Sequence, residues 1–463
     1  MNDYFVYGTG KHDGECLDYV SLLDRIQTHM TNKFPRNQMS EFIDRKDEGR
    51  QLLLGQIERY LEVNQVRAKS GNDIESISVD IYEDMAGMSF LSKYLNNPDD
   101  YPDLEEINVN RWNSVVLKKS GGRVSFTNES FLSPKHALDV LRRILSKNNE
   151  SIDEAVPGVT SSITDNIRIT AFIYPIIPKD YGISASIRIT RPQNISEKEL
   201  IRQGSVSPEI IGFLKMCIKY SVSMCIAGKM GSGKTTFLNY LLKSIPASKR
   251  IMPIEEGSRE LSLTQTDADG RLINQVIPAL TKPDDTNRNQ NFDTSRILQF
   301  GLRFNADYFV PQEMRTGAAY YAQEAARTGS GVLTTIHSND AESTYPRMVT
   351  LMKLSSNLDE DTLMRLAVEA FPIIVYMREL EDSTRRIMEV LEGVRFVRGK
   401  GLECRTLYSF DVEDNKENSD GSIRVIGHFR RVNGISPRLV RHLLNNGAPK
   451  KLVDKYAMEG NFD

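Results

Sequence analysis

The sequence predicts an α/β protein in which a C-terminal domain with a mostly parallel sheet follows a smaller α+β domain. From about Ser207 onward, short apolar runs alternate with helical segments, which is typical of parallel strands joined by crossover helices. Before that point the apolar runs are short and alternating, which indicates hairpins, and one segment has a strongly amphipathic helical pattern. At 463 residues the chain is too long for one compact core, so we expect two or three domains.

These changes of pattern set the expected domain limits. Residues 1–80 are polar and charge-rich, and we expect an N-terminal extension that is helical or partly flexible. Residues 81–190 are expected to form the small α+β domain, and residues 191–206 a linker. Residues 207–463 are expected to form the α/β domain, ending in a helical tail.

Each domain has its own expected elements. Before the linker, helices are expected over Leu52–Val66 and Pro134–Ser146, and strands at Ile107–Val109, Val115–Leu117, Ile167–Pro175 and Ser184–Ile189. After it, strands are expected at Ser223–Ala227, Arg250–Glu255, Tyr308–Val310, Val332–Ile336 and Ile373–Met377. Helices are expected there at Thr235–Ile245, Thr294–Asn305, Gly317–Arg327 and Pro437–Asn445. A polar break at Glu413–Gly421 is expected to join the last strands.

Composition narrows the class of function. The 59 basic and 62 acidic residues give a formal net charge of −3, so nucleic acid is not an expected partner. The four cysteines lack metal-binding spacing and are expected to be reduced thiols of a cytoplasmic protein. The first residues do not resemble a secretory signal, and no stretch reaches the ~20 apolar residues of a membrane span. We therefore expect membrane association to be peripheral and to depend on partners.

The strongest motif is Gly228–Thr235, which reads GKMGSGKT and matches the phosphate-binding pattern GxxxxGK[ST]. An apolar strand precedes it and a helix follows, so backbone N–H groups and the helix N-terminus would point at an anion. Lys234 would reach the β- and γ-phosphates of ATP, and the Thr235 hydroxyl would bind Mg²⁺. The predicted nucleotide contacts are Gly228, Lys229, Met230, Gly231, Ser232, Gly233, Lys234, Thr235 and Thr236.

A second signal is the run Asp307–Glu313, DYFVPQE, in which an apolar strand ends in a carboxylate. At such a strand end, Glu313 would lie beside the γ-phosphate, where it could polarise the attacking water and bind the metal. The alternative is a surface glutamate after an edge strand, and the proline in the run favours an edge or a bulge. The pattern alone leaves both interpretations open.

Two more polar groups accompany buried strands. Glu255 closes the strand that follows the phosphate-loop helix, where it could contact the Mg²⁺ shell or orient water, or simply belong to a solvated acidic loop. His337 follows an apolar strand and could sense the γ-phosphate and couple it to domain movement. The alternative is an ordinary core or capping histidine.

Three arginines are candidate nucleotide contacts. Arg188 and Arg191 lie at the domain junction, and Arg315 follows Glu313 by two positions. The planar guanidinium matches phosphate, and an arginine supplied across a subunit interface stabilises charge on a transferring phosphoryl group. The alternative for each is a solvated surface position.

Taken together, these motifs resemble the type II/type IV secretion ATPase superfamily, and most closely its tight-adherence (Flp) pilus ATPases. Leu104–Val124 looks like the family's N-terminal hairpin region, Glu199–Phe213 like its entry to the ATPase domain, and Arg250–Leu261 like its Asp box. Leu302–Arg315 looks like its Walker B motif and Thr328–Asn339 like its His box. Two later stretches, Ser383–Gly393 and Gly427–Leu443, continue the likeness. The resemblance therefore runs from about Leu104 to Val453.

The resemblance implies a RecA-like P-loop ATPase domain and a homo-hexameric ring that hydrolyses ATP with Mg²⁺, with ATP bound between the two domains and at subunit borders. It assigns Lys234 and Thr235 to phosphate and Mg²⁺, Glu255 to the Asp-box acid, Glu313 to the catalytic carboxylate and His337 to the second His-box histidine. It further implies a motor for a bacterial pilus or secretion machine, acting on an inner-membrane platform protein from the cytoplasmic face of the membrane.

The sequence departs from the family pattern at four positions. Gln312 replaces the usual glycine before the Walker B glutamate, and Ser330 stands in place of the first His-box histidine. Lys282 replaces an arginine after the Asp box, and Glu256 replaces an aspartate within it. The phosphate-binding residues are retained, so these changes bear on the rate of turnover and on which arginine acts across the interface.

Other classes of function remain alongside the motor. A nucleic-acid motor of RecA-like type would share the phosphate loop and the Walker B carboxylate. The nearly neutral net charge of the chain disfavours this class, because nucleic acid is bound by basic surfaces. A regulatory subunit that holds ATP with little turnover would fit Gln312 and Ser330. A small-molecule kinase is disfavoured because no lid for a second substrate is evident. Pilus extension, pilus retraction, protein secretion and conjugation all remain open as the driven process.

Overall fold

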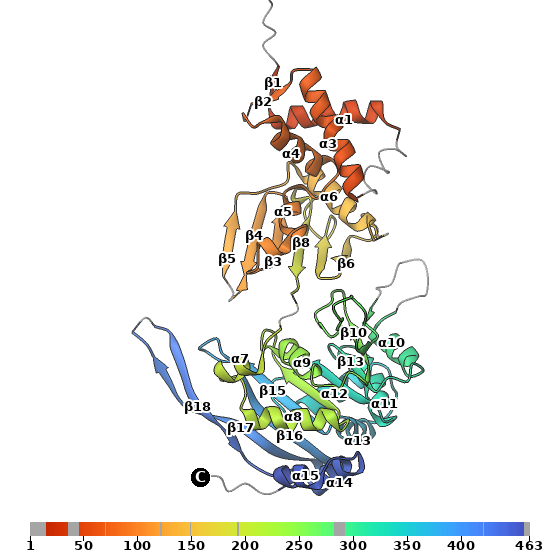
Figure 1. Cartoon of the computed structure of the whole chain (residues 1–463), viewed down its shortest axis with the longest axis vertical. Helices are drawn as coiled ribbons and strands as arrows, with labels where there is room; N and C mark the ends of the chain where they lie inside the picture. The colour runs from red at the N-terminus through yellow and green to blue at the C-terminus, as the bar shows by residue number, and fades with distance from the viewer. Residues whose placement is uncertain are drawn as a thin grey trace, which may run out of the picture. The chain divides into compact units, whose positions relative to one another are not determined.

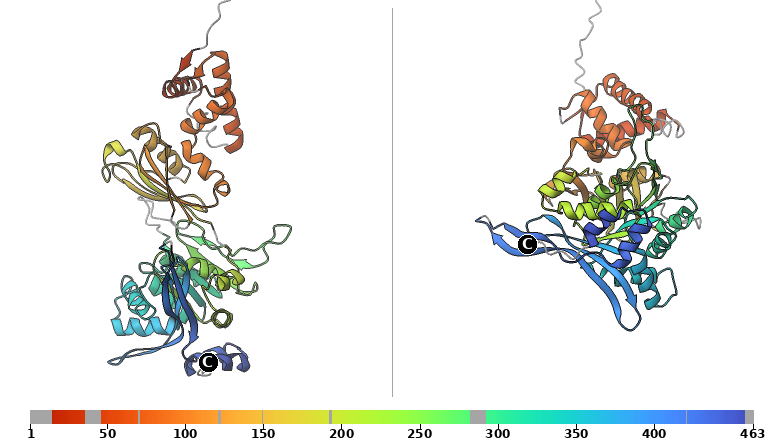
Figure 2. Two further views of the ribbon diagram at one scale, coloured as in Figure 1. Left: turned by 90° about the vertical axis from the view of Figure 1, so that its left-hand side faces the viewer. Right: turned by 60° about the horizontal axis from the view of Figure 1, so that its bottom comes forward.

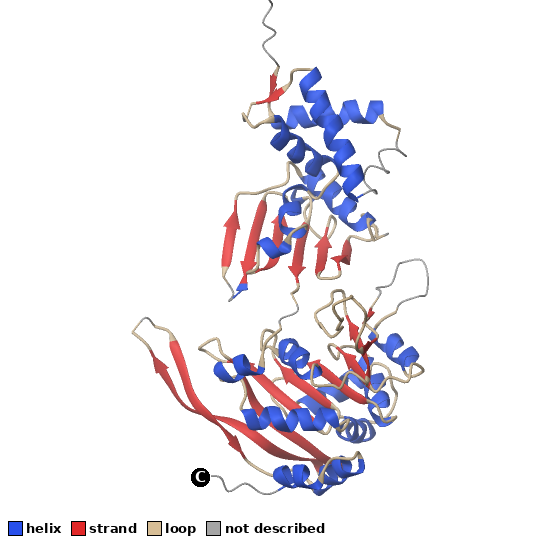
Figure 3. Cartoon of the chain, in the orientation of Figure 1, coloured by secondary structure: helices blue, strands red, loops and turns tan. Residues whose placement is uncertain are grey.

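The structure is a computed structural model that describes residues 15–35, 46–69, 71–120, 123–148, 150–191, 194–281, 292–419 and 421–457. The chain divides into two compact units, residues 1–189 and 190–463 (Figure 1). Figure 3 shows helices in both units and a sheet in each.

The first unit begins with a group of helices. They are α1 (Tyr19–Lys33), α3 (Lys46–Val63) and α4 (Ile74–Met85), beside a short parallel pair formed by β1 (Cys16–Leu17) and β2 (Arg67–Ala68). Asp18 and Asp73 cap α1 and α4 by accepting backbone N–H bonds in the first turn. The helices share a core of apolar side chains at helical spacing, which includes Leu22, Ile26, Met30, Leu53, Ile57, Leu61, Ile77 and Ile81.

The rest of this unit is an antiparallel six-stranded sheet with one long helix. The strand order is β5-β4-β3-β8-β7-β6. The strands are β3 (Leu104–Arg111), β4 (Ser114–Lys119), β5 (Val124–Thr127), β6 (Gly158–Thr164), β7 (Ile167–Phe172) and β8 (Ser184–Ile189). Short helical turns are η1 (Ser89–Leu91), α5 (Ser92–Leu95), η2 (Pro98–Asp100) and η4 (Lys179–Tyr181).

The helix α6 (Pro134–Ser146) has the bounds that the sequence predicts. Ser133 caps it by accepting the His136 N–H, and Pro134 occupies the first helical position, where its missing N–H costs nothing. Its buried face, with Val140, Leu141 and Ile144, packs into one core with the strands of the sheet. This confirms the predicted α+β character of the smaller domain.

Asp84 ties the helical group to the sheet part of the first unit. Its carboxylate accepts hydrogen bonds from the hydroxyls of Tyr19 at 2.7 Å and Ser89 at 2.5 Å. Its backbone carbonyl accepts one from Arg143 of α6 at 2.9 Å. The residue is only 7% exposed, so these bonds replace the water that a buried carboxylate loses.

We expect Asp84→Ala to destabilise the protein by about 2 kcal/mol, because it leaves the Tyr19 hydroxyl without its buried acceptor. The measurement is the shift of the unfolding transition in urea, followed by circular dichroism. Asp80→Ala is the matched control, since Asp80 lies on the same helix and is exposed. Equal shifts for the two variants would contradict the joining role of Asp84.

The second unit is built on one large mixed sheet in the order β11-β10-β13-β14-β9-β15-β16-β17-β18, with β12 also paired to β10. The parallel part contains β9 (Met224–Gly228), β10 (Arg250–Glu255), β11 (Gln275–Val276), β12 (Ala279–Leu280), β13 (Tyr308–Pro311), β14 (Gly331–Ile336) and β15 (Ile373–Glu379). Within this part every pair of neighbouring strands runs parallel, which confirms the predicted α/β class.

An antiparallel extension continues the sheet beyond β15. It consists of β16 (Arg385–Val397), β17 (Gly401–Glu417) and β18 (Ile423–Arg431). The polar stretch 413–421, expected to be a break, is largely strand, because β17 pairs with β18 as far as Glu417 opposite Ile423. The far ends of β17 and β18 form a two-stranded ribbon that projects from the sheet (Figures 1 and 2).

Helices cover both faces of the sheet. One core joins the strands to α8 (Pro208–Lys219), α9 (Lys234–Leu242), α14 (Pro437–Asn445) and α15 (Lys450–Ala457). The other joins them to α10 (Thr294–Gly301), α11 (Ala318–Arg327), α12 (Thr344–Met352) and α13 (Glu360–Ala370). Along β9, Met224 and Ile226 enter the first core, whereas Cys225 and Ala227 enter the second. A strand buried on both faces reads as a continuous apolar run, as the sequence shows.

The helix α7 (Glu197–Arg202) lies within the range expected to be a linker, and Ser196 caps it by accepting the Glu199 N–H.

In the part of the chain that the structure describes, no helix is long and apolar enough to cross a bilayer.

Candidate functional site

The phosphate-binding loop joins the end of β9 to the start of α9, as the motif predicts. Gly228 has φ +153°, and a Cβ there would lie 2.2 Å from the carbonyl oxygen of Met377, so only glycine fits. Gly231 and Gly233 also have positive φ values, which curl the backbone before the helix begins at Lys234. The loop therefore has the form that directs backbone N–H groups and a helix N-terminus toward an anion.

Lys234 is held inside this loop. Its ammonium donates to the carbonyl of Lys229 at 2.7 Å and lies 3.4 Å from Nδ1 of His337. Burial lowers the pKa of Lys234 below its usual range, and the negative charge of Glu313 opposes that shift. The cation is thus positioned at the loop with its charge directed toward the neighbouring strand ends.

Polar side chains at the ends of the parallel strands form a connected row. His337 follows β14, and its Nε2 lies 3.2 Å from Oε1 of Glu313, which follows β13. Oε2 of Glu313 accepts a bond from Arg315 at 2.7 Å, and Arg315 lies 3.5 Å from the carboxylate of Glu256. Parallel strands end at one edge of a sheet, so residues far apart in sequence meet beside the phosphate loop.

The row reaches α10 on its far side. Oε1 of Glu256 accepts a hydrogen bond from the Thr294 hydroxyl at 2.9 Å, and Thr294 is the first residue of α10. Glu313 itself is fixed by a backbone bridge to Thr335 of β14. The carboxylate that the sequence proposes as catalytic is therefore rigidly placed between a histidine and an arginine.

The alternative that Glu313 follows an edge strand is wrong. β13 lies between β10 and β14, inside the sheet. Pro311 is accommodated because it is the last residue of β13. Proline has no backbone N–H to donate, but the hydrogen bonding to β10 continues after it. The next residue, Gln312, donates its N–H to the carbonyl of Ile254 at 2.9 Å.

The strand that ends in Glu255, β10, is not a direct neighbour of β9, the strand before the phosphate loop. The order is β10-β13-β14-β9, so two strands separate them. With a spacing of about 4.8 Å per strand, the ends of β10 and β9 are about 14 Å apart. His337 and Glu313 are correspondingly nearer to the loop than Glu255 is.

Glu255 is engaged in shaping the loop that follows it. The side chain is 1% exposed, and Oε1 accepts the backbone N–H groups of Glu260 at 2.5 Å and Leu261 at 2.8 Å. Burial raises the pKa of Glu255 to about 6, although these two N–H groups favour its charged form. Its proposed role at the Mg²⁺ shell remains a prediction.

The shift of Glu255 predicts a pH dependence of stability. The pKa rises from 4.5 to about 6 on folding, so between these values the folded protein keeps a proton that the unfolded chain releases. The free energy of unfolding therefore falls as pH rises through this window, by about 2 kcal/mol for this group. Glu255→Gln cannot ionise, so we expect it to gain about that much relative to the parent between pH 4.5 and 7.5.

The check is the free energy of unfolding of parent and Glu255→Gln measured in urea at both pH values. Glu369→Gln serves as the control, because Glu369 is an exposed carboxylate on α13. A constant difference between Glu255→Gln and the parent at the two pH values would argue against a neutral, buried Glu255.

The remaining predicted residues are placed as follows. Arg315 is paired within its own chain, with Glu313 and Glu256, as described above. Arg188 is exposed on β8 of the first unit, opposite Glu106 of β3, and Arg191 belongs to the second unit. A nucleotide contact by Arg188 or Arg191 stays a prediction, as does an interface role for Arg315.

The positions that depart from the family pattern have structural contacts. The Ser330 hydroxyl donates to the carbonyl of Ala306 at 2.9 Å, so it fastens the start of β14. The Gln312 side-chain carbonyl accepts the N–H of Glu256 at 3.4 Å and links the ends of β13 and β10. Lys282 lies outside the described residues.

Magnesium suits the oxygen donors that the site presents. The Thr235 hydroxyl follows Lys234 at the start of α9, and the Glu313 carboxylate lies across the loop beside His337. Hydroxyl and carboxylate oxygens together with phosphate oxygens are the ligands that Mg²⁺ prefers.

One contact at the loop was not predicted from the sequence. Arg385, which begins β16, donates from Nε to the carbonyl of Gly231 at 2.8 Å across 154 positions of sequence. Arg385 lies in the segment Ser383–Gly393 that resembles the family, but the resemblance assigns it no role, and the contact depends on the pairing of β15 with both β9 and β16.

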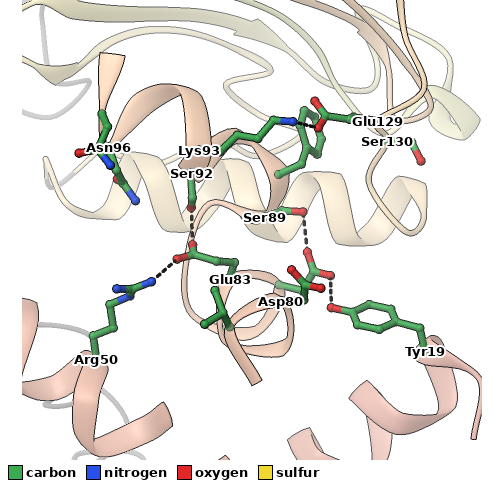
Figure 4. A pocket seen from close by; sticks show the side chains of 14 residues that line it. Tyr19, Arg50, Asp80, Glu83, Ser89, Ser92, Lys93, Asn96, Glu129 and Ser130 are labelled. Atoms are coloured by element: carbon green, nitrogen blue, oxygen red, sulfur yellow. Dashed lines mark hydrogen bonds and ion pairs between the residues drawn. The ribbon is translucent and has the colours of Figure 1, made fainter. Parts of the chain in front are cut away.

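A separate polar pocket of about 590 Å³ lies in the first unit, beside Asp84 (Figure 4). Its charged groups are largely paired with one another: Arg50 and Ser92 contact Glu83, and Lys93 contacts Glu129. None of the site residues predicted from the sequence lines it. The phosphate-loop motif lies in the second unit.

Comparison with known proteins identifies the family of this chain. A family model described as type II/IV secretion system protein matches residues 123–400. The chain is 27% identical over 317 residues to the type IV secretion system protein VirB11 of Bartonella quintana, covering 60% of this chain and 86% of that protein. It is 28% identical over 318 residues to an uncharacterised protein of Methanocaldococcus jannaschii, covering 68% of this chain and 54% of that protein.

Among solved structures, the ATPase DotB of Legionella pneumophila shares 15% identity at a TM-score of 0.46, covering 79% of this chain and 85% of that one. The fold assignment rests on the sheet order and the phosphate loop described above. The family match spans the loop, the ends of all the parallel strands and the hairpin of β15 and β16.

Proposed function

Because the chain belongs to the family of type II/IV secretion system proteins, we propose that it is a hexameric motor that hydrolyses ATP with Mg²⁺ and drives a bacterial pilus or secretion machine. The observation that carries the proposal is the connected row from Lys234 through His337 and Glu313 to Arg315 at the edge of a RecA-like sheet. Such a row is what phosphoryl transfer to water requires, because catalysis there consists of positioning and charge stabilisation.

In this proposal each residue has one task. The loop amides and Lys234 bind the β- and γ-phosphates, and Thr235 holds Mg²⁺, which neutralises charge on the phosphate oxygens. Glu313 orients and polarises the attacking water, since its carboxylate is fixed beside the loop by His337 and Arg315. His337 contacts both Lys234 and Glu313, so it is placed to respond to the γ-phosphate.

The work step follows from the two-unit architecture. We propose that nucleotide binding draws in an arginine from the junction, Arg188 or Arg191, and that hydrolysis releases it, so that one unit moves against the other within a ring. The moving ring would act on an inner-membrane platform protein, with the chain held at the cytoplasmic face by that partner. Type IV secretion is the process that the family membership favours, and pilus assembly is the process that the resemblance of the sequence motifs adds.

The test is steady-state ATP hydrolysis by a size-fractionated sample, with and without Mg²⁺. The expected result is Mg²⁺-dependent turnover that elutes at the size of a hexamer. ATP binding without turnover in an assembled ring would replace the motor by a nucleotide-holding subunit, and Gln312→Gly with Ser330→His would then be the reversions to make. Strong stimulation by single-stranded DNA, lost steeply with salt, would instead favour a nucleic-acid motor.

A further inference from the structure

The turn between β15 and β16 lies directly against the phosphate-binding loop. β15 pairs in parallel with β9, and its Met377 stands opposite Gly228, the last residue of that strand. The antiparallel register of β15 and β16 then pairs Glu379 with Arg385 at the end of the hairpin. These two side chains reach the glycines of the loop.

Both side chains lie close to Gly231, and Arg385 also lies close to Gly233. Arg385 donates from Nε to the carbonyl of Gly231 at 2.8 Å, and a Cβ at Gly233 would lie 3.2 Å from Cδ of Arg385. A Cβ at Gly231 would lie 3.2 Å from Oε2 of Glu379. The two side chains are themselves 4.0 Å apart between Nη2 and Oε1. The loop glycines therefore have two effects. They permit the positive φ values of the backbone, and they leave room for the side chains of Arg385 and Glu379 to come close.

The turn that carries the pair is firmly anchored on its other side. Asp382 accepts the backbone N–H of Val425 on β18 at 3.1 Å, and Arg386 lies 3.5 Å from Asp382. Leu380 packs in a small core with Phe410 and Val425 of the ribbon strands. The turn that carries Arg385 is therefore held in place by its contacts with β17 and β18.

We propose that Arg385 is a positioning residue for nucleotide binding, and that Glu379 holds its guanidinium in place. A loop with glycines at positive φ is free to sample many conformations, and ordering it costs binding free energy. Fixing the carbonyl of Gly231 keeps the neighbouring N–H groups in the arrangement that binds phosphate. This inference rests on the proposed function, since it concerns the same loop.

The role predicts a particular kinetic signature. Loss of a hydrogen bond from a half-exposed charged donor is expected to weaken MgATP and MgADP binding about tenfold in Arg385→Ala. The turnover number at saturating ATP is expected to change less than twofold, because Arg385 orders the loop before the chemical step. Arg385→Lys retains a donor and should restore most of the affinity.

The experiment measures the Kd of MgADP by calorimetry and the KM and kcat for ATP, on the full chain. Arg395→Ala is the matched control, because Arg395 is an exposed arginine of β16 that pairs with Glu403. Hydrogen exchange of peptides covering residues 228–236 in nucleotide-free protein is the second readout. It should be faster in Arg385→Ala and unchanged in Arg395→Ala, whether or not the protein hydrolyses ATP.

The outcomes separate the inference from the proposed function. If Lys234→Ala loses MgADP binding while Arg385→Ala binds within twofold of the parent, the positioning role is overturned and the proposed function stands. If the parent binds no nucleotide, the proposed function fails, and the exchange rates alone decide the role of Arg385. If Arg385→Ala does not fold, Arg385→Met, which keeps the length of the side chain but has no donor, is measured in its place together with Glu379→Gln, and parent-like affinity and exchange in both would overturn the inference.

Discussion

Lys234→Ala is expected to reduce MgADP affinity about 100-fold and to abolish measurable hydrolysis of ATP. The ammonium is buried within the phosphate loop, where it donates to the carbonyl of Lys229. A charge-assisted bond to phosphate contributes about 1.5–3 kcal/mol, which corresponds to roughly 10- to 100-fold in affinity. Calorimetric titration with MgADP and a phosphate-release assay measure the two effects.

The control for this variant lies in the same loop. Lys229 is exposed, and only its backbone carbonyl takes part in the loop, as the acceptor for Lys234. Lys229→Ala removes the same charge while keeping that carbonyl, so we expect near-parent affinity. If both variants bind MgADP like the parent, the loop does not hold phosphate through Lys234.

Glu313→Gln is expected to lower kcat about 1000-fold while nucleotide binding stays within a few-fold of the parent. A positioned general base contributes about 10²- to 10⁴-fold, and the amide cannot accept the proton of the attacking water. Its carbonyl oxygen can still accept the bond from Arg315, so the frame around the residue is kept. Single-turnover hydrolysis in pre-assembled samples is the measurement.

The control for Glu313→Gln is Glu324→Gln, which changes a carboxylate on α11 that lies 3.5 Å from Arg327 on the surface. We expect this variant to hydrolyse ATP like the parent. Parent-like turnover by Glu313→Gln would remove Glu313 as the base, and Glu255 would become the next carboxylate to examine.

The sequence predicts local features of this protein well. α6 has the predicted bounds because Ser133, Pro134 and the apolar spacing that follows are all local signals. The strand before the phosphate loop is likewise apparent, since β9 is buried on both faces and reads as one apolar run. The phosphate loop itself is defined by eight consecutive residues, so no tertiary information is needed to find it.

Features that depend on strand order could not be predicted in this way. The distance of Glu255 from the loop depends on β13 and β14 lying between β10 and β9. Pro311 favoured an edge strand, yet it closes an interior one, because a proline at the last position breaks no later bond. The polar residues at the end of β17 predict a break, yet they are extended, because pairing with β18 rather than hydrophobicity holds them in the strand.

The antiparallel extension of the sheet decides where this protein can be cut. A fragment that stops at residue 400, where the family match ends, would keep the phosphate loop and every residue of the row beside it. It would also strip β17 from β16 along Glu389–Val397, leaving a long open edge of unpaired backbone N–H and C=O groups. Such an edge recruits strands from other molecules and leads to aggregation. Residues 401–431 therefore cover the edge of the sheet that β16 would otherwise expose, and a soluble fragment must include them.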